Sequence, residues 1–246
     1  MHTKKYIPTS ETLSIRSWDF PNKGNSMNIM NIKIKRIIMS VLGVVFCGIS
    51  VGFFKFAAFG VDPFQSLMSG IDHLVPLSYG TLNVVVNAVL LLFALIFDRH
   101  YIGIGTMVNL FLLGYIVEFS QGALNAVLPE ESIVWRVVIF IIGFVSHCFS
   151  SAIYMTADLG VSTYDAVAII MAEKWKIGKF KYIRIITDFV CVVLGITLFM
   201  IGGGTLSGIP AFVGIGTILT AFFMGPLIDF FNRTVAQPIL YTKTKK

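Results

Sequence analysis

Charged side chains are scarce in this sequence. Only 13% of its 246 residues are Asp, Glu, Lys or Arg, whereas 56% are hydrophobic. A water-soluble domain of this length needs a polar coat, and so few charges cannot supply one. The scarcity excludes an ordinary soluble fold and favours a chain that uses the lipid bilayer as its solvent. The net charge of +6 does not indicate nucleic-acid binding, because the basic residues lie in short clusters beside apolar stretches.

Cysteine and other metal-binding side chains are also rare. The three cysteines, Cys47, Cys148 and Cys191, lie inside apolar runs without a partner at a metal-binding spacing. We interpret them as small buried residues. The sequence contains no phosphate-binding loop and no ordered set of nucleophile, base and acid. We therefore expect no metal, no cofactor and no enzymatic activity.

The two ends of the chain lack long apolar segments. Residues 1–31 are rich in Ser, Thr, Asn and Lys and do not resemble a cleavable signal peptide. We interpret them as a disordered cytoplasmic tail, within which Met27 and Met30 offer alternative translation starts. Residues 234–246 are predicted to form a second, basic cytoplasmic tail.

Long apolar runs are abundant. A helix that crosses a membrane requires about 20 mostly apolar residues. Two further stretches, about 63–73 and 163–175, have helical character but are too short to span. The predicted fold class is thus an all-α integral membrane protein with six transmembrane helices and one short helix in each half. The six spans lie at about 36–59, 80–98, 102–124, 134–157, 183–202 and 209–231.

Positive charges alternate along the chain. Lys and Arg gather in the amino-terminal segment, after the second span, after the fourth span and in the carboxyl tail. The loops near 60–79, 125–133 and 203–208 contain neither residue. Because cytoplasmic loops carry the excess of Lys and Arg, both termini are expected in the cytoplasm.

The two halves of the membrane region, residues 32–132 and 133–233, repeat one another. Each half has three spans, an odd number, so the second copy must cross the membrane in the opposite direction. Such inverted repeats occur in many secondary transporters. The matching residues include Arg36, Gly43, Ser50, Gly60, Gly103, Gly105, Gly114 and Glu118 in the first half and Arg136, Gly143, Ser150, Gly160, Gly214, Gly216, Gly225 and Asp229 in the second.

Both short helices begin with strong capping signals. Asp62 followed by Pro63 favours a helix start, and Ser162 with Asp165 has the form of a capping box. We interpret these as starts of two re-entrant helices that enter the protein from opposite faces, where helix amino ends can hold an anion or a polar substrate. The alternative is a pair of amphipathic helices that lie flat at the membrane interfaces.

Polar residues inside the spans are candidates for a substrate or coupling site. The second span of each half carries a pair four residues apart, Asn83 with Asn87 and Arg184 with Asp188, and His147 lies near the middle of the fourth span. Intramembrane polar groups usually face protein or water and mark function. The alternatives are a self-satisfied Arg–Asp pair near the interface and a histidine that only bonds across helices.

Four further charged residues occupy equivalent places in the two halves. Glu118 and Asp229 lie at the far ends of the third spans, and Arg36 and Arg136 lie at the starts of the first. The sequence therefore predicts a Glu118–Arg136 pair at the outer face and an Asp229–Arg36 pair at the inner face, either as gates or as structural ion pairs. Lys55 is expected to extend to the outer interface.

Two glycine-containing motifs carry a family resemblance. Gly60-Val61-Asp62-Pro63-Phe64 and Gly103-Ile104-Gly105-Thr106, with their second-half counterparts, resemble the YczE/YitT-like group of bacterial inner-membrane proteins. The resemblance covers about residues 34–232 and implies a multipass location in the bacterial inner membrane. It implies no catalytic or binding residues, because the biochemical role of that group is poorly defined.

The sequence favours a small-molecule or ion transporter that works by alternating access. Its expected partners are the lipid bilayer and a small polar or ionic substrate, not nucleic acid. The alternative is a non-transporting membrane partner or anchor that supports another protein complex, with its basic tails on anionic lipid or protein. A polar cavity that reaches Asp188, His147 or Asn87 would favour transport, and a dry core packed around glycines would favour the partner role.

Overall fold

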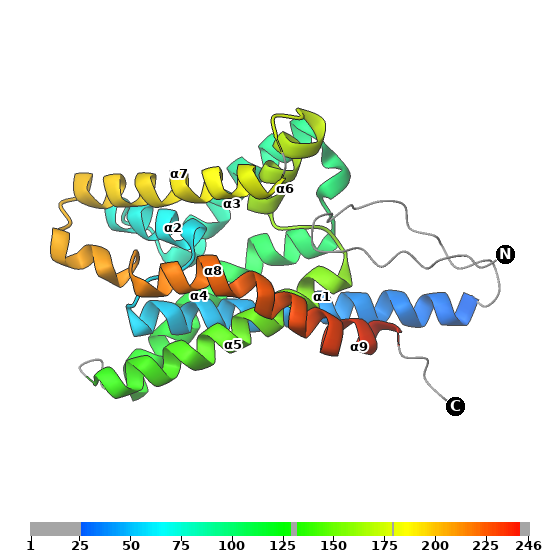
Figure 1. Ribbon diagram of the computed structural model, residues 1–246, viewed down its shortest axis with the longest axis horizontal. Helices are drawn as coiled ribbons and strands as arrows, with labels where there is room; N and C mark the ends of the chain where they lie inside the picture. Colours follow the sequence, from blue (N-terminus) through cyan, green and yellow to red (C-terminus); the bar gives the residue numbers. More distant parts are fainter. Residues whose placement is uncertain (1–25, 129–131, 179, 242–246) are drawn as a thin grey trace.

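The computed structural model describes residues 26–128, 132–178 and 180–241, and this part of the chain is a bundle of helices (Figure 1). Six helical segments are long and apolar enough to cross a membrane. The prediction of an all-α protein with six candidate spanning helices is therefore confirmed for the described residues. The six segments are built on α1 (Ser26–Ala57), α3 (Tyr79–Phe97), α4 (Ile104–Val127), α5 (Ile133–Ala157), α7 (Phe180–Ile201) and α8 (Ile215–Phe231).

The last span departs furthest from its predicted bounds. α8 begins only at Ile215, because the segment before it contains Pro210 and forms a 3-10 helix, Leu206–Ala211. Proline has no amide hydrogen to donate inside an α-helix. Gly214 is instead the N-cap of α8, and its amide donates a hydrogen bond to Thr217 Oγ1 at 3.2 Å.

Helix α1 extends into the predicted amino-terminal tail. It begins at Ser26, so residues 26–31, which were expected to be disordered, are helical. This stretch contains neither Pro nor Gly and leads directly into the first apolar run, so the helix can extend through it. The predicted disorder of residues 1–25 lies outside the described residues, as does the end of the chain, 242–246.

The predicted carboxyl-terminal tail, residues 234–246, is also partly helical. α8 continues through a π-helical turn, Asn232–Ala236, into α9 (Gln237–Tyr241). Ala236 and Leu240 are one helical turn apart and are buried against α1 and α5. Burial of this apolar pair stabilises helix where the charge pattern alone predicted a tail.

Two short helices link the halves of the bundle. α2 (Pro63–Leu74) follows α1, and α6 (Thr163–Ile169) follows α5 and continues through a π-helical turn, Ile170–Lys174. α2 packs against α7, and α6 packs against α3. Each short helix therefore lies on a spanning helix from the other half of the chain. A 3-10 turn, Arg99–Tyr101, joins α3 to α4.

α1 and α5 make the most extensive helix–helix contact in the described part of the chain. At the start of α5, Arg136 donates hydrogen bonds to the carbonyl oxygens of Ala57 at 2.7 Å and Ala58 at 3.1 Å, at the end of α1. Near the start of α1, Arg36 lies 3.7 Å from the carboxylate of Asp158, at the end of α5. The two helices therefore run antiparallel.

Two glycines allow the halves to approach closely. Gly60 and Gly160 have φ of +103° and +107°, a region that L side chains rarely adopt. A Cβ atom on Gly160 would lie 2.5 Å from the amide nitrogen of Gly103, and one on Gly60 would lie 2.6 Å from that of Gly214. The loop before each short helix thus touches the start of the third span of the other half.

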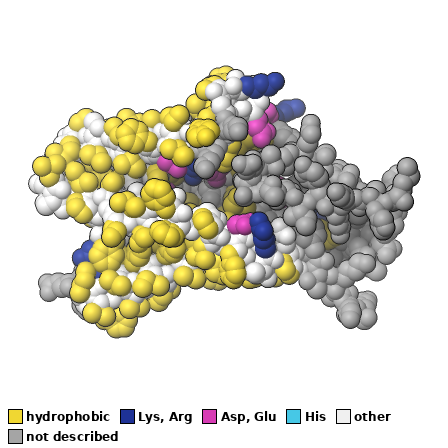
Figure 2. All heavy atoms as spheres, viewed as in Figure 1, with side chains coloured by type: hydrophobic (Ala, Val, Ile, Leu, Met, Phe, Trp, Pro, Cys, Tyr) yellow, Lys and Arg dark blue, Asp and Glu magenta, His cyan; other side chains and the backbone are white. Residues whose placement is uncertain are grey.

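Large apolar side chains cover much of the outside of the bundle (Figure 2). Examples are Phe119, Phe189 and Phe222, which are 77%, 68% and 73% exposed. Monomeric soluble proteins rarely expose contiguous apolar areas of this kind. The outer surface of the bundle is therefore suited to contact with lipid.

Candidate functional site

The amino-terminal turn of α2 is held by its own side chains. Asp62 is the N-cap, its carboxylate accepts a hydrogen bond from the Gln65 amide at 3.1 Å, and Pro63 occupies the first helical position. Proline is tolerated there because the first amides of a helix have no partner inside the helix. Ser66 Oγ donates to the carbonyl oxygen of Phe212 at 2.9 Å. These contacts direct the start of α2 into the protein.

The amino-terminal turn of α6 meets that of α2. Ser162 Oγ accepts a hydrogen bond from the Asp165 amide at 3.1 Å and donates one to the Asp165 carboxylate at 2.7 Å. The rings of Phe64 and Tyr164 stack with their centroids 4.9 Å apart. This stacking brings together the first turns of two helices that lie one hundred residues apart in sequence.

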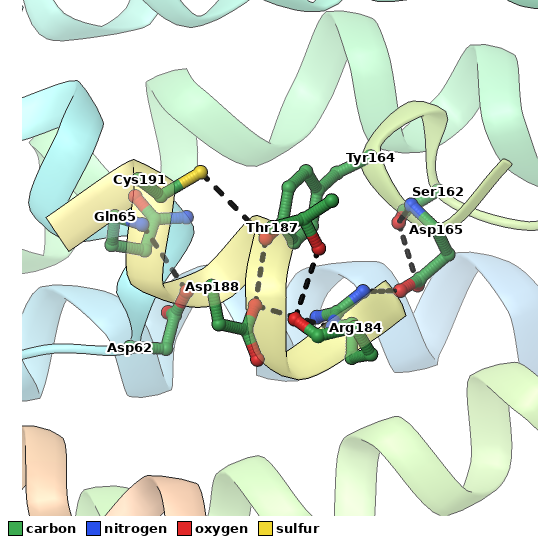
Figure 3. Close-up of polar contacts among 9 residues, drawn as sticks. All are labelled: Asp62, Gln65, Ser162, Tyr164, Asp165, Arg184, Thr187, Asp188 and Cys191. Atoms are coloured by element: carbon green, nitrogen blue, oxygen red, sulfur yellow. Dashed lines mark hydrogen bonds and ion pairs between the residues drawn. The ribbon is translucent and has the colours of Figure 1, made fainter. Parts of the chain in front are cut away.

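An ion-pair cluster joins α6 to α7 (Figure 3). The Arg184 guanidinium pairs with Asp165, and its Nε lies 3.3 Å from Asp188 Oδ1. Tyr164 donates a hydrogen bond to the same Asp188 oxygen at 2.6 Å, and its ring centroid lies 4.4 Å from the guanidinium carbon. Arg184 is thus shared by two carboxylates. The Arg184–Asp188 pair expected from sequence forms part of a larger cluster.

A neutral polar group joins α3 to α6 beside this cluster. Asn87 Nδ2 donates to the carbonyl oxygen of Asn83 at 2.8 Å and to its side-chain oxygen at 3.1 Å. Thr163 donates to Asn87 Oδ1 at 2.5 Å. Since Thr163 and Tyr164 are neighbours, the first turn of α6 connects the Asn pair to the ion-pair cluster. Asn83 Nδ2 is buried without a hydrogen-bond partner in the structure, which is uncommon for a buried donor.

Asp62 adds a third carboxylate to the site. Figure 3 draws it on α2 beside Asp188, and it interacts electrostatically with both Asp188 and Arg184. Burial raises the pKa of the Asp62 carboxyl to about 6, against the opposing effects of the Gln65 amide and of Arg184. The Asp62 carboxylate also interacts electrostatically with the phenol of Tyr79, on α3. Asp62 is therefore suited to exchange a proton near neutral pH.

Replacing Asp62 by asparagine should flatten the pH dependence of stability. The pKa of Asp62 rises from its ordinary value of 3.8 to about 6 in the folded protein, so folding favours the protonated form. The stability that Asp62 contributes must therefore fall as the pH rises through this window. Asparagine keeps the helix cap and cannot titrate. Thermal melts of the purified protein between pH 4 and 8 would measure the effect.

Asp229→Asn is the matched control, because Asp229 lies in an exposed ion pair with Arg233. It should leave the slope of melting temperature against pH unchanged. An unchanged slope in Asp62→Asn would show that Asp62 does not carry the titration.

His147 lies outside the cluster. Its Nδ1 atom is 3.8 Å from Cys47 Sγ, and its ring centroid is 5.6 Å from that of Phe54. These contacts place it in the buried interface between α1 and α5. The structure brings Asn83, Asn87, Arg184 and Asp188 to one place, and His147 to another.

The predicted Glu118–Arg136 and Asp229–Arg36 pairs are wrong. Glu118 accepts a hydrogen bond from the Gly80 amide at 3.0 Å, and Asp229 pairs with Arg233 at 2.9 Å. Arg136 and Arg36 reach the ends of α1 and α5, as described above. For Glu118 and Arg136 the physical reason is that helix termini leave backbone groups without partners, and these side chains satisfy them. Asp229 and Arg36 instead have other charged partners, Arg233 and Asp158.

A second charged group was not expected from the sequence. Lys55 turns into the protein: its side chain is 12% exposed, and Nζ lies 3.9 Å from Asp72 and 3.4 Å from the Tyr79 ring centroid. The Tyr79 hydroxyl donates to Gln65 on α2. The one sequence signal was a lysine in the last turn of a span, followed by an acid on the next short helix.

Two hollows in the surface lie away from the site. One of about 570 Å³ is lined by residues of α4 that include Glu118, and one of about 590 Å³ is an apolar hollow between α1 and α4. Neither is lined by Asn87, His147 or Asp188. The site is reached from the surface of α7 instead, where the charged side chains are partly exposed.

Several proteins of unknown role resemble this chain. An "uncharacterized membrane protein YczE" of Bacillus subtilis (strain 168) is 25% identical over 176 residues, covering 70% of this chain and 74% of that protein. An uncharacterized protein of Haemophilus influenzae is 22% identical over 85% of this chain and 89% of its own length. The uncharacterized protein YyaS of Bacillus subtilis is 21% identical, with 81% and 93% covered.

No solved structure matches the chain. The six apolar helices and the membrane-protein relative together identify a multipass membrane protein. The model of one family, described as a family of unknown function (DUF6198), matches residues 34–233, which include every residue of the site. The chain therefore belongs to this family, a YczE-like family of unknown function.

Proposed function

We propose that this protein is a membrane transporter of small polar or ionic molecules that works by alternating access. The observation that carries the proposal is a difference between two contacts at equivalent places. α3 packs along α4, whereas no comparable contact joins α7 to α8 within the described part of the chain. In transporters built from inverted repeats, one repeat moves against the other to close one face and open the opposite one.

Two equivalent glycines report this difference. A Cβ atom on Gly114, in α4, would lie 2.5 Å from Asn83 Cβ, so α3 and α4 are in close contact there. Nothing lies within 4 Å of a Cβ atom on Gly225, the matching residue of α8. The residue of α7 that matches Asn83 is Arg184. A furrow thus separates α7 from α8, and Figure 2 shows acidic and basic side chains between their apolar surfaces.

The inverted repeat that this mechanism requires is supported by contacts that occur twice. Gly60 and Gly160 have the same unusual backbone conformation and touch the same part of the opposite half. α1 and α5, the first spans of the two halves, run antiparallel. The stacked Phe64 and Tyr164 rings are equivalent residues, which is expected for a pair on the axis that relates the halves.

The re-entrant interpretation of α2 and α6 is supported by their burial. Phe64 and Met68 of α2 and Tyr164 and Ala166 of α6 are buried in protein. A helix that lies flat at an interface would expose its polar face to water along its length. The transporter is further proposed to lie in the inner membrane with both termini in the cytoplasm, as the distribution of Lys and Arg indicates.

A disulfide between α7 and α8 tests the exchange of conformations. Lys181 and Gly225 match Gly80 and Gly114, which lie in contact. If the second half visits the closed arrangement of the first, Lys181→Cys/Gly225→Cys should form a disulfide under mild oxidation, although the furrow separates the helices in this structure. The native cysteines are replaced by alanine, and the cross-link is read as a gel shift after cleavage of the α7–α8 loop.

Lys181→Cys/Gly122→Cys is the control pair, because Gly122 lies on α4 with nothing within 4 Å of its Cβ position. It should stay uncross-linked. The proposal fails if both thiols of the test pair react with maleimide and yet no disulfide forms, since the furrow would then be permanent.

One observation favours the second function, a non-transporting partner of another membrane complex. Asn83, Asn87 and His147 are buried, and none of them lines either of the two hollows described above. A protein with this role would keep the furrow as a docking place and would not close it. The cross-linking result separates the two functions.

A further inference from the structure

Charged side chains border the α7–α8 furrow in a segment that crosses the membrane. Arg184 and Asp188 belong to the candidate span Tyr182–Ile201, and their side chains are 33% and 28% exposed. On the same helix Ile185 and Phe189 are 56% and 68% exposed, as expected for residues that face lipid. Charges against hydrocarbon are costly. Arg184 lies near the start of this span and offsets part of that cost by pairing with Asp165 and Asp188. Water, or a ligand that carries a charge of its own, would offset the rest.

The charges of the furrow do not balance. Asp62, Asp165 and Asp188 contribute three carboxylates, whereas Arg184, which pairs with Asp165 and Asp188, supplies one guanidinium. The excess of negative charge would attract a cation and repel an anion. The Tyr164 ring already packs against Arg184 and stacks on Phe64, so the attraction for a cation comes from the carboxylates.

The two helices beside the furrow expose large apolar side chains. α8 exposes Ile218 and Phe222, and α7 exposes the lipid-facing Ile185 and Phe189. In the first half, Gly114 contacts Asn83. If the second half closed in the same way, Arg184 would contact Gly225, whose Cβ position is open in this structure. A ligand in this space must therefore carry positive charge for the carboxylates and apolar surface for the side chains of the flanking helices.

We propose that the α7–α8 furrow binds a lipophilic organic cation, with its charge against Asp188 and Asp165 and its apolar body between the two helices. The proposal names the substrate class of the transporter described above and so rests on that function. The cation reaches the furrow from the membrane, because the furrow opens between two lipid-facing helices.

Binding of two ions of the same shape tests the proposal. Tetraphenylphosphonium and tetraphenylborate are alike in size and apolar surface and differ in the sign of their charge. Purified protein in a neutral detergent should bind the phosphonium at least about tenfold more tightly than the borate, a difference of about 1.4 kcal/mol. Isothermal titration calorimetry measures both affinities on the unaltered chain, so no variant needs to fold.

Variants then locate the site. Asp188→Asn and Asp165→Gln introduce the residues found at the matching first-half positions, Asn87 and Gln65. Both substitutions are therefore expected to be compatible with the fold. Each should weaken phosphonium binding at least about fivefold. Asp229→Asn removes a carboxylate from the exposed pair with Arg233 and should leave the affinity unchanged.

Four outcomes would overturn the proposal. Equal affinity for the two ions would mean that only apolar contact matters. Loss of phosphonium binding on adding phosphatidylethanolamine would assign the furrow to a lipid amine. Absence of binding in a protein that elutes as a dimer would assign the furrow to a second copy of the chain. A protein that cross-links across the furrow but binds no cation would keep the transporter function and lose this substrate class.

Discussion

Adding a single methyl group at Gly160 should lower the stability of the folded protein by about 2–6 kcal/mol. At φ of +107° an alanine would be strained. Its Cβ atom would also lie 2.5 Å from the Gly103 amide nitrogen and 2.5 Å from Thr106 Oγ1. Neither neighbour can move freely. Thr106 Oγ1 accepts from the Gly103 amide and donates to the Val161 carbonyl oxygen at 2.7 Å, so a shift would break both hydrogen bonds.

Gly60→Ala should have an effect of similar size, because its Cβ atom would lie 2.6 Å from the Gly214 amide nitrogen. The expected loss is measured as a lower melting temperature in detergent and as less folded protein after purification. Gly122→Ala is the control: nothing lies within 4 Å of the added carbon, and alanine suits a helix better than glycine. It should be neutral or slightly stabilising. A melting temperature of Gly160→Ala equal to that of the wild type would contradict the close approach of the two halves.

Replacing Arg184 by asparagine should destabilise the protein by about 2 kcal/mol. Removing one partner from a buried ion pair costs about 3–5 kcal/mol, and partial exposure of the Arg184 side chain reduces that penalty. Without the Arg184 guanidinium, the carboxylates of Asp165, Asp188 and Asp62 would repel one another. Chemical denaturation or thermal melting of the purified variant measures the loss.

The structure also predicts how this loss is reversed. A pair that satisfied only itself would be restored by Arg184→Asn/Asp188→Asn, which copies Asn83 and Asn87. Because Arg184 also pairs with Asp165, the double variant should recover only part of the stability. Adding Asp165→Gln, which copies Gln65 of the first half, should recover the rest.

The triple variant should also lose its preference for tetraphenylphosphonium, since two of the three carboxylates are gone. If the double variant is already as stable as the triple one, Asp165 is not a partner of Arg184. A triple variant that still prefers the cation would place the binding site elsewhere.

Local patterns in the sequence were enough to predict the helices and most of their ends. Whether a stretch can span a bilayer depends on about 20 consecutive residues, which the sequence shows directly. The starts of α2 and α6 depend on the side chains of Asp62 and Ser162 and on backbone groups three residues away. The residue matches that suggest a repeat are likewise a property of residue order.

Charge alone did not predict the two ends of the membrane region. The polar residues before α1 and after α8 suggested tails, yet helix continues on both sides. Burial of Ala236 and Leu240 depends on α1 and α5 lying nearby, which no local pattern reveals.

Only the tertiary structure decided which charged groups meet. The predicted symmetric pairs were consistent with the repeat but ignored two kinds of competing partner. Glu118 and Arg136 bond free backbone groups at helix ends, and Asp229 and Arg36 pair with other charged side chains. Asp165 of α6 meets Arg184 of α7, and Lys55 of α1 turns inward to Asp72 of α2. Both pairs join elements of the same half, and which partners meet depends on how the short helices pack. The sequence could not predict the furrow either. The two halves carry matching glycines, and only the packing of the helices places Gly114 in contact with a neighbouring helix and leaves Gly225 open.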